Sequence, residues 1–365
     1  MTPHVAEPLS GLRYPSRVHI FPRRRLTGAA VALLTLVLAA CNSTSGASTS
    51  PTPTSTQFLP TAATSASASG SASASASPTT HPSITPATNL DGITVTGAMG
   101  SKPDVKIPTP WGIDKSQAKV LVQGSGPAVT SSSLIEIHYY GADGYTGNVF
   151  DESYTSGKTI SYGVSGFITG FQTGVIGQKV GSRVLIGITG PDGYDSQGGN
   201  ANIGILVGDS LVFVVDIVAA SLSEPAGTAV TPASGLPTVS GDLKAPVVTI
   251  ASKDTPSSTL VVQPLIKGSG KAVTATSTLR ADYAEYAWST GKVVKQTYGY
   301  APLDGTLSTA IPGWQAALVG QTVGSRVLIV VPPAQAYPSG NPRIDVKPGE
   351  TMVYVVDILF AYEAG

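Results

Sequence analysis

The chain has 365 residues, which is long enough for two domains of ordinary size. Lys plus Arg and Asp plus Glu number 22 each, so no net charge favours nucleic acid or an anionic surface as a partner. The single cysteine, Cys41, excludes an intrachain disulfide and a cysteine metal cluster. The 41 glycines and 28 prolines indicate β structure with many turns and some unstructured chain.

The N-terminal 40 residues have the pattern of a secretory signal peptide. Arginines at 13, 17 and 23–25 precede an uncharged run over 26–40, which is shorter than the roughly 20 residues a membrane span needs. The letters LAAC at 38–41 resemble a bacterial lipobox, which implies that Cys41 is lipidated and anchors the protein to the cell membrane, outside the cytoplasm. An ordinary signal peptide with a chance cysteine is the alternative, and the consecutive arginines also suggest a twin-arginine signal.

Residues 41–89 are predicted to form the lipidated cysteine and a disordered tether. Positions 42–89 are rich in Ser, Thr, Ala and Pro and contain no Asp, Glu, Lys or Arg. A segment of this composition cannot bury enough apolar surface to fold. We expect it to hold the folded part of the protein away from the membrane.

The rest of the chain contains a long internal repeat. VGSRVLI occurs at 180–186 and 323–329, QGSGPAVT at 123–130 is echoed at 267–274, and LVFVVDIV at 211–218 is echoed at 352–359. The offsets of about 141–144 residues are too long for a solenoid repeat, so a whole domain is repeated. We predict domain 1 over 90–222, a linker over 223–241 and domain 2 over 242–365.

Each repeat is predicted to be an α+β domain. Residues 134–140 alternate between apolar and polar side chains, and 183–188 and 211–218 are rich in β-branched residues, so all three segments are expected to be strands. The segment 167–177 lacks a two-residue period and is expected to be a short helix that Thr169 caps, with Phe171 and Val175 on one side. In the second copy, Pro312 stands near the expected helix start, where proline is tolerated.

Six segments in a fixed order carry a family resemblance. They are HYYG (138–141), VFDES (149–153), FITGFQTGV (167–175), KVGSRVLI (179–186), PDGYD (191–195) and LVFVVDI (211–217). Together they resemble the FKBP-type peptidyl-prolyl cis–trans isomerases, over about 100 residues of domain 1 and more loosely over domain 2. The resemblance implies two tandem domains, each with a five- or six-stranded antiparallel sheet curled around one short helix and an apolar pocket between them.

Isomerisation of an X–Pro bond needs neither a nucleophile nor a cofactor. Amide resonance gives the bond a barrier of about 18–20 kcal/mol, which twisting removes. A water-poor aromatic cavity that fits the twisted amide better than the planar one lowers that barrier, and fixed dipoles orient the carbonyls. The expected substrates are therefore proline-containing exported polypeptides, and the expected function is to assist their folding.

The resemblance also implies which residues form the pocket of domain 1. Phe171 would be the floor under the proline ring, the Ile168 N–H and the Tyr194 hydroxyl would donate to substrate carbonyls, and Asp151 would tune the electrostatics beside Tyr139. The full implied set is Tyr139, Phe150, Asp151, Phe167, Ile168, Phe171, Tyr194 and Phe213. Taken one at a time, such aromatic residues on strands are more often plain core.

Domain 2 departs from this pattern. Val294 and Lys295 stand where Phe150 and Asp151 stand in domain 1, so one wall loses its aromatic ring and a cation replaces the carboxylate. Burial of an unpaired ammonium is costly, so we expect Lys295 to point outward or to close the pocket differently. The remaining equivalents are Tyr283, Ile311, Trp314, Tyr337 and Tyr354. We predict a degenerate domain that keeps the fold and loses most activity, although Trp314 restores the commonest floor residue of the family.

No metal site is expected. His138 is interpreted as structural, while His4, His19 and His81 fall in the signal or the tether, so the four histidines offer no ligand set. The run at 191–200 lacks the ligand spacing of an EF-hand loop. Two alternative functions remain open, namely a non-catalytic module that binds proline-containing segments and a structural protein whose domains are spacers.

Overall fold

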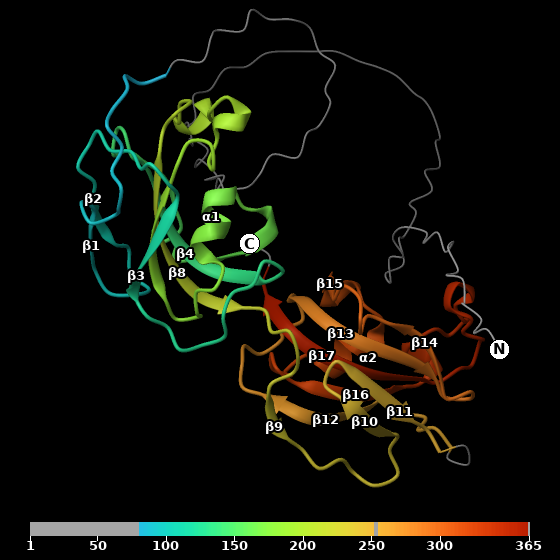
Figure 1. Ribbon diagram of the computed structural model, residues 1–365. Coiled ribbons are helices and arrows are strands. Elements are labelled where there is room, and N and C mark those ends of the chain that lie inside the picture. The colour runs from blue at the N-terminus through green and yellow to red at the C-terminus, as the bar shows by residue number, and fades with distance from the viewer. Residues whose placement is uncertain (1–79, 252–254, 364–365) are drawn as a thin grey trace, which may run out of the picture.

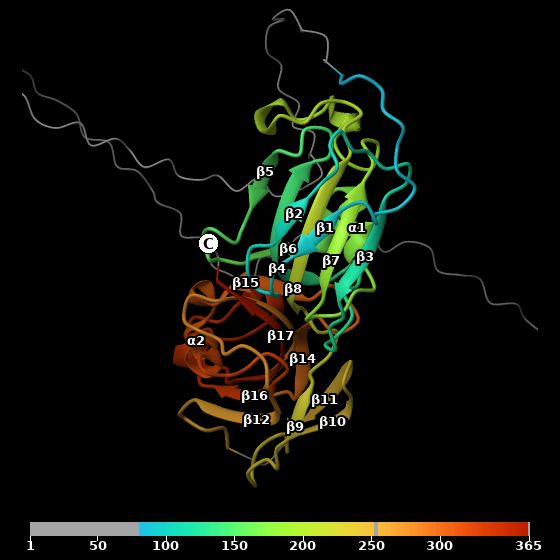
Figure 2. The ribbon, with the colours of Figure 1, turned by 90° about the vertical axis from the view of Figure 1, so that its left-hand side faces the viewer.

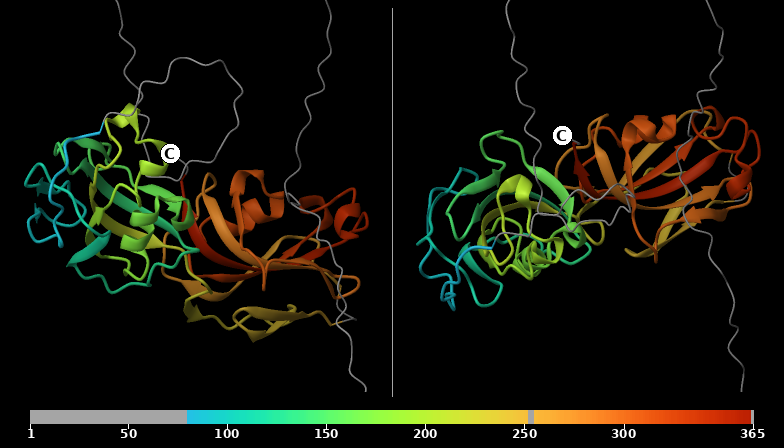
Figure 3. Two further views of the ribbon diagram at one scale, coloured as in Figure 1. Left: turned by 45° about the horizontal axis from the view of Figure 1, so that its top comes forward. Right: turned by 90° about the horizontal axis from the view of Figure 1, so that it is seen from above.

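A computed structural model describes residues 80–251 and 255–363 of the chain. The expectations for the signal peptide, Cys41 and the tether up to residue 79 lie outside the described residues. Within the described ranges, no helix is both long enough and apolar enough to cross a membrane. Two β-rich domains lie side by side (Figures 1 and 3), and Arg280 Nη1 of domain 2 donates to the Ser132 carbonyl of domain 1 at 2.7 Å.

Domain 1 is built on a six-stranded antiparallel sheet. Its strands follow the order β3-β7-β8-β4-β5, and β6 pairs with the other end of β4. The long strands are those that the sequence predicts. The elements are β3 (Gln117–Val122), β4 (Leu134–Asp143), β5 (Val149–Glu152), β6 (Ile160–Gly163), α1 (Thr169–Val175), β7 (Arg183–Ile188) and β8 (Leu211–Ala220).

Domain 2 repeats this topology in a seven-stranded sheet. The order is β14-β13-β17-β16-β12-β9, with β15 paired to β13, and all described pairings of the sheet are antiparallel. The elements are β9 (Gly227–Ala229), β12 (Val261–Gly268), β13 (Thr278–Ala287), β14 (Lys292–Gln296), β15 (Leu303–Thr306), α2 (Pro312–Leu318), β16 (Arg326–Val331) and β17 (Met352–Tyr362).

Both faces of each sheet are apolar, and each face has its own cover. In β8, Phe213 and Val215 face the cluster under α1, whereas Val212 and Val214 face a second cluster on the other side. The second cover of domain 1 includes the hairpin β1 (Thr94–Thr96) and β2 (Asp104–Lys106), which lies across the sheet in Figure 2. In domain 2 the hairpin of β10 (Thr238–Asp242) and β11 (Ala245–Thr249) contributes to the corresponding cover of the domain 2 sheet.

The two helices have the same place and length in both domains. Each spans seven residues and buries one side, which is formed in α1 by Phe171 and Val175. Helix α2 begins at Pro312, as the sequence predicts. The capping prediction for α1 is wrong, because Ile168 is the N-cap residue and no side chain caps the helix. The Thr169 hydroxyl therefore plays no part in starting it.

The domain boundaries differ from those expected at two places. Residues 80–89, assigned to the tether, lie against domain 1, where Thr80 bridges to Val207 and the Ala87 N–H donates to the Gly112 carbonyl at 2.8 Å. The segment 223–241, assigned to a linker, contains β9 and the first part of β10. Short polar segments of this kind are held by backbone pairing, which composition does not reveal.

A buried ion pair fastens each hairpin to its sheet. In domain 1, Arg183 Nε and Nη2 donate to the two carboxylate oxygens of Asp216 at 2.6 and 2.7 Å, and its other donors reach the carbonyls of Gly97 and Ser101 at 2.9 Å. Both charged side chains are at most 2% exposed. The guanidinium is therefore fully paired, as a buried charge must be.

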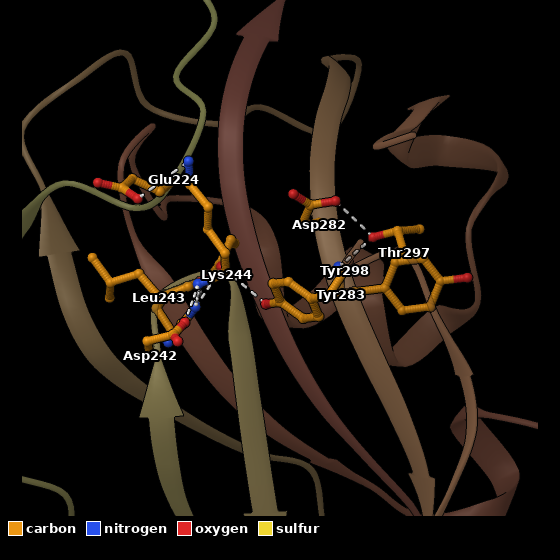
Figure 4. Close-up of polar contacts among 10 residues, drawn as sticks. Glu224, Asp242, Leu243, Lys244, Asp282, Tyr283, Thr297 and Tyr298 are labelled. Carbon is orange, nitrogen blue, oxygen red and sulfur yellow. Dashed lines mark hydrogen bonds and ion pairs between the residues drawn. The ribbon is translucent and has the colours of Figure 1, made fainter. Parts of the chain in front are cut away.

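Domain 2 repeats the arrangement with Arg326 and Asp357, and Arg326 also donates to the Leu243 carbonyl in the hairpin turn. Figure 4 shows Leu243 beside Lys244, which reaches towards Glu224 at 3.8 Å. The Tyr298 hydroxyl donates to Asp357 at 2.8 Å and completes the cluster.

The substitution Asp216→Ala should destabilise domain 1 by about 3–5 kcal/mol, because it leaves Arg183 buried without its counter-charge. Urea unfolding of the full chain, monitored at the domain 1 transition, measures the change. Asp91→Ala is the matched control, since it breaks only the exposed ion pair with Lys119. Equal, small effects of the two substitutions would contradict a fastening role for the buried pair.

Candidate functional site

The residues that the resemblance places in the domain 1 pocket come together between α1 and the sheet. Phe171 on the helix meets Phe213 on β8 edge to face, with ring centroids 5.3 Å apart, and Phe167 at 4.4 Å. Phe150 on β5 meets Phe213 at 5.6 Å with an interplanar angle of 74°. Edge-to-face contacts of this kind stabilise a rigid aromatic arrangement. Six of the eight residues belong to one core cluster, and Phe150 packs against it.

The remaining member, Asp151, is joined to the cluster by a hydrogen bond. The Tyr139 hydroxyl donates to Asp151 Oδ2, while Asp151 Oδ1 accepts from the Glu152 N–H at 2.9 Å. Tyr139 is fully buried and Asp151 is partly exposed. Burial, followed by the hydrogen bond to Asp151, raises the pKa of Tyr139 well above its usual range, so the phenol stays a proton donor.

Two further donors border the same space. Ile168 is 2% exposed, and among the described residues no backbone carbonyl accepts a hydrogen bond from its N–H. Tyr194 is buried, and burial together with the nearby Asp151 charge raises the pKa of its hydroxyl to about 12. Both groups are therefore neutral donors at physiological pH.

Gly141 on β4 makes room for the aromatic wall. A Cβ atom built on this glycine would lie 2.7 Å from a Phe150 ring carbon and 2.8 Å from a Phe213 ring carbon. Gly141 also pairs with Asp151 across the β4–β5 ladder. The bare backbone at this position is therefore what allows the Phe150 ring to close over the sheet.

The five aromatic and aliphatic residues implied for domain 2 also come together, around a small hollow of about 10 Å³. Trp314 on α2 meets Tyr283 and Tyr354 edge to face, with centroid separations of 5.3 and 5.6 Å. Ile311 and Tyr337 line the same hollow. Val294 packs against the domain 2 core but does not fill the volume of the phenylalanine ring at the equivalent place in domain 1.

The hollow contains a carboxylate that the sequence reasoning missed. Glu285 on β13 is fully buried, lines the hollow and accepts a hydrogen bond from the Tyr354 hydroxyl at 2.7 Å. It pairs with Lys295 across the β13–β14 ladder, as Gly141 pairs with Asp151 in domain 1. Lys295 thus holds the ladder position of Asp151 but does not line the hollow, whose carboxylate comes from the neighbouring strand.

Lys295 is partly buried, and no ion pair within 4.0 Å joins it to Glu285 in the described part of the chain. Burial lowers the pKa of Lys295 and the Glu285 charge opposes that shift. Burial also raises the pKa of Glu285, and its hydrogen bond with Tyr354 opposes the shift. Burial thus disfavours the charged form of both side chains, and their mutual attraction does not fully offset the loss of hydration.

Three buried polar atoms on residues that line this hollow have no hydrogen-bond partner within the described residues. They are the Tyr283 hydroxyl, Trp314 Nε1 and Glu285 Oε2. An unsatisfied buried donor or acceptor costs about 1–3 kcal/mol. A ligand that offers both an acceptor and a donor would remove these costs.

The structure gives His138 a structural role, as expected. Its Nδ1 lies 3.0 Å from Ser153 Oγ and its ring stacks on Tyr154. In domain 2, Thr297 has the place of Ser153, accepting from the Tyr283 N–H and donating to Asp282 (Figure 4). This side-chain bridge is therefore a feature of the repeated scaffold.

The family model described as "FKBP-type peptidyl-prolyl cis-trans isomerase" matches residues 126–218 and 269–359, which together make up about half of the chain. The chain belongs to the FKBP-type peptidyl-prolyl cis-trans isomerase family. The two matches lie one in each domain, so both domains are FKBP-type.

Curated relatives are single-domain in length. A "Probable FK506-binding protein" of Corynebacterium glutamicum is 31% identical over 119 residues, which cover 33% of this chain and 98% of that protein. An "FK506-binding protein" of Streptomyces anulatus is 32% identical over 120 residues, 32% of this chain and 96% of that protein. Among solved structures, the three FKBP domains of wheat FKBP73 are 17% identical with a TM-score of 0.30, covering 68% of this chain and 94% of that one.

The pH dependence of domain 2 stability should reveal Glu285. Because burial raises its pKa in the folded state, the free energy of unfolding should fall as the pH rises above about 4.5 and through the raised value. Glu285→Gln should remove this loss, so its melting temperature should exceed that of the parent at pH 8 and match it more closely at pH 4. Glu224→Gln, at a position where the side chain is 45% exposed, is the control. A variant less stable than the parent at pH 8 would contradict a costly buried carboxylate.

Proposed function

We propose that domain 1 catalyses cis–trans isomerisation of X–Pro bonds in exported polypeptides and so assists their folding. The observation that carries this proposal is the aromatic set around Phe171, with the Tyr139–Asp151 hydrogen bond at its border. Membership of the isomerase family supports the reaction class. Export and lipid anchoring through Cys41 are part of the proposal and are supported by the sequence pattern alone.

The chemistry needs only differential binding. The proline ring would rest on Phe171, between walls that Phe150 and Phe213 form. The twisted amide is less polar than the planar amide because resonance is lost, so it is favoured where water is scarce. A fall of 1.36 kcal/mol in the barrier speeds the exchange tenfold.

Fixed donors would hold the substrate chain while the bond turns. The Ile168 N–H at the start of α1 and the Tyr194 hydroxyl would each bind a carbonyl oxygen beside the proline. Asp151 fixes the orientation of Tyr139 and carries negative charge at the rim of the apolar space. Because these dipoles belong to the folded protein, they need no reorganisation during the reaction.

Domain 2 would contribute little to the rate. It lacks the wall that Phe150 forms in domain 1, and its hollow holds a buried carboxylate with one unpaired oxygen. The second candidate function, a binding module for proline-containing segments, is favoured for domain 2 by its unpaired Tyr283 hydroxyl and Trp314 Nε1, which would donate to backbone carbonyls. On this view domain 2 retains chains while domain 1 isomerises them.

The test is NMR exchange of a short X–Pro peptide catalysed by the full chain. Phe171→Leu should lower kcat/KM at least about tenfold, because the smaller side chain removes the aromatic floor. Trp314→Leu, the matched change in domain 2, should leave kcat/KM nearly unchanged.

Circular dichroism would verify that both variants fold. Loss of catalysis in Trp314→Leu with retention in Phe171→Leu would contradict the assignment of the activity to domain 1. No acceleration by the unaltered chain would leave the binding module as the better reading.

A further inference from the structure

A cluster of three side chains lies where the N-terminal segment meets domain 1, away from the aromatic site. His81, Asp143 and Asp209 each offer a ligand atom, and these atoms all lie within 4.8 Å of one another. Asp143 ends β4, Asp209 precedes β8 and His81 belongs to the segment that contacts domain 1. The expectation that the histidines offer no ligand set rested on placing His81 in a disordered tether, and the structure corrects that placement.

One carboxylate oxygen of Asp143 in this cluster lacks a hydrogen-bond donor. It is 3% exposed, and its Oδ1 accepts from both the N–H and the hydroxyl of Thr146 at 2.7 Å. Its Oδ2 is buried and has no hydrogen-bond partner among the described residues. A buried carboxylate oxygen without a donor is rare in native proteins and points to a missing group.

Asp209 places a second buried carboxylate beside the first. It is 4% exposed, and its Oδ2 accepts from the Leu206 N–H at 2.8 Å. Two carboxylates this close repel each other when both are ionised, so a cation between them would stabilise the pair. No lysine or arginine forms an ion pair with either carboxylate within the described ranges.

His81 is the third member of the set. Its Nε2 lies 3.7 Å from Asp209 Oδ2, and its ring stacks on Tyr145 with centroids 3.9 Å apart and planes within 3°. The backbone bridge between Thr80 and Val207 fixes the segment alongside. The imidazole is therefore oriented before any ligand arrives, which lowers the entropic cost of binding.

We propose that His81, Asp143 and Asp209 bind one divalent transition-metal ion, for which Zn²⁺ fits best. Zinc takes histidine nitrogen and carboxylate oxygen at about 2.0–2.2 Å, and three protein ligands leave one position for water. His81, Tyr145 and Asp209 line a surface crevice, which gives an ion access to two of the three ligands. Calcium requires six to eight oxygen ligands, so a site with one imidazole and two carboxylates disfavours it.

The site is specific to the first repeat. Ala287 and Glu350 stand at the positions of domain 2 that correspond to Asp143 and Asp209. Glu350 is already satisfied by the N–H and the hydroxyl of Ser289 at 2.9 and 2.6 Å. A metal bound only in domain 1 would fasten the segment 80–86 to the loop before β8.

The metal-free alternative is a proton shared between Asp143 and Asp209 with His81 beside it. The two alternatives predict different zinc binding. Isothermal titration of the full chain with Zn²⁺ alone, in metal-free buffer, should give one site that His81→Gln weakens by at least about tenfold. Asp143→Asn and Asp209→Asn should each weaken zinc binding similarly, while His138→Gln should leave it unchanged.

Cobalt absorption and hydrogen exchange test the same site by independent measurements. Co²⁺ in place of Zn²⁺ should give visible absorption bands that disappear in His81→Gln, a partly exposed position whose change should not unfold the domain. Amide hydrogen exchange of residues 80–86 should slow when Zn²⁺ is added. Absence of zinc binding, equal binding by His81→Gln and the parent, or a preference for Ca²⁺ over Zn²⁺ would each overturn the proposal.

Discussion

The candidate sites of the two domains differ according to how large a side chain one ladder position can hold. At that position, Gly141 in domain 1 leaves space that the Phe150 ring fills, with a virtual Cβ only 2.7 Å from the ring. In domain 2 the same position carries Glu285, and the smaller Val294 stands where the ring would be. An aromatic wall and a carboxylate compete for one volume, and each domain contains one solution of that competition.

The rest of the fold serves to hold that ladder in register. Strands β8 and β17 are buried on both faces, so each sheet needs a helix on one side and a hairpin on the other. The Arg183–Asp216 and Arg326–Asp357 pairs fasten the hairpin side. The helix side is thereby left to carry the aromatic residues, and the N–H of Ile168 or Ile311 at the helix start faces no described backbone acceptor. The buried ion pairs and the candidate site thus lie on opposite faces of each sheet.

Much of this could be predicted from the sequence, because the repeat and the family motifs fix which residues are equivalent. The strands, the short helix and the aromatic set around Phe171 follow from them. Glu285 could not be found by comparing positions one at a time, since its role emerges only when β13 and β14 are paired and Lys295 lies opposite. His81 was missed because composition alone marked its segment as tether, whereas a backbone bridge and a stacked ring hold it in place.

The β4–β5 ladder of domain 1 is expected to shape the proposed isomerase site. The most direct measurement is the catalysed X–Pro exchange rate of a full chain in which domain 1 receives the residues of domain 2 through Gly141→Glu, Phe150→Val and Asp151→Lys together. We expect most of the acceleration to be lost, because the aromatic wall and the Tyr139–Asp151 bond are both gone. Circular dichroism verifies that domain 1 still folds around Phe213, whose ring a Cβ at position 141 would approach to 2.8 Å. An unchanged rate in a folded triple variant would contradict that expectation.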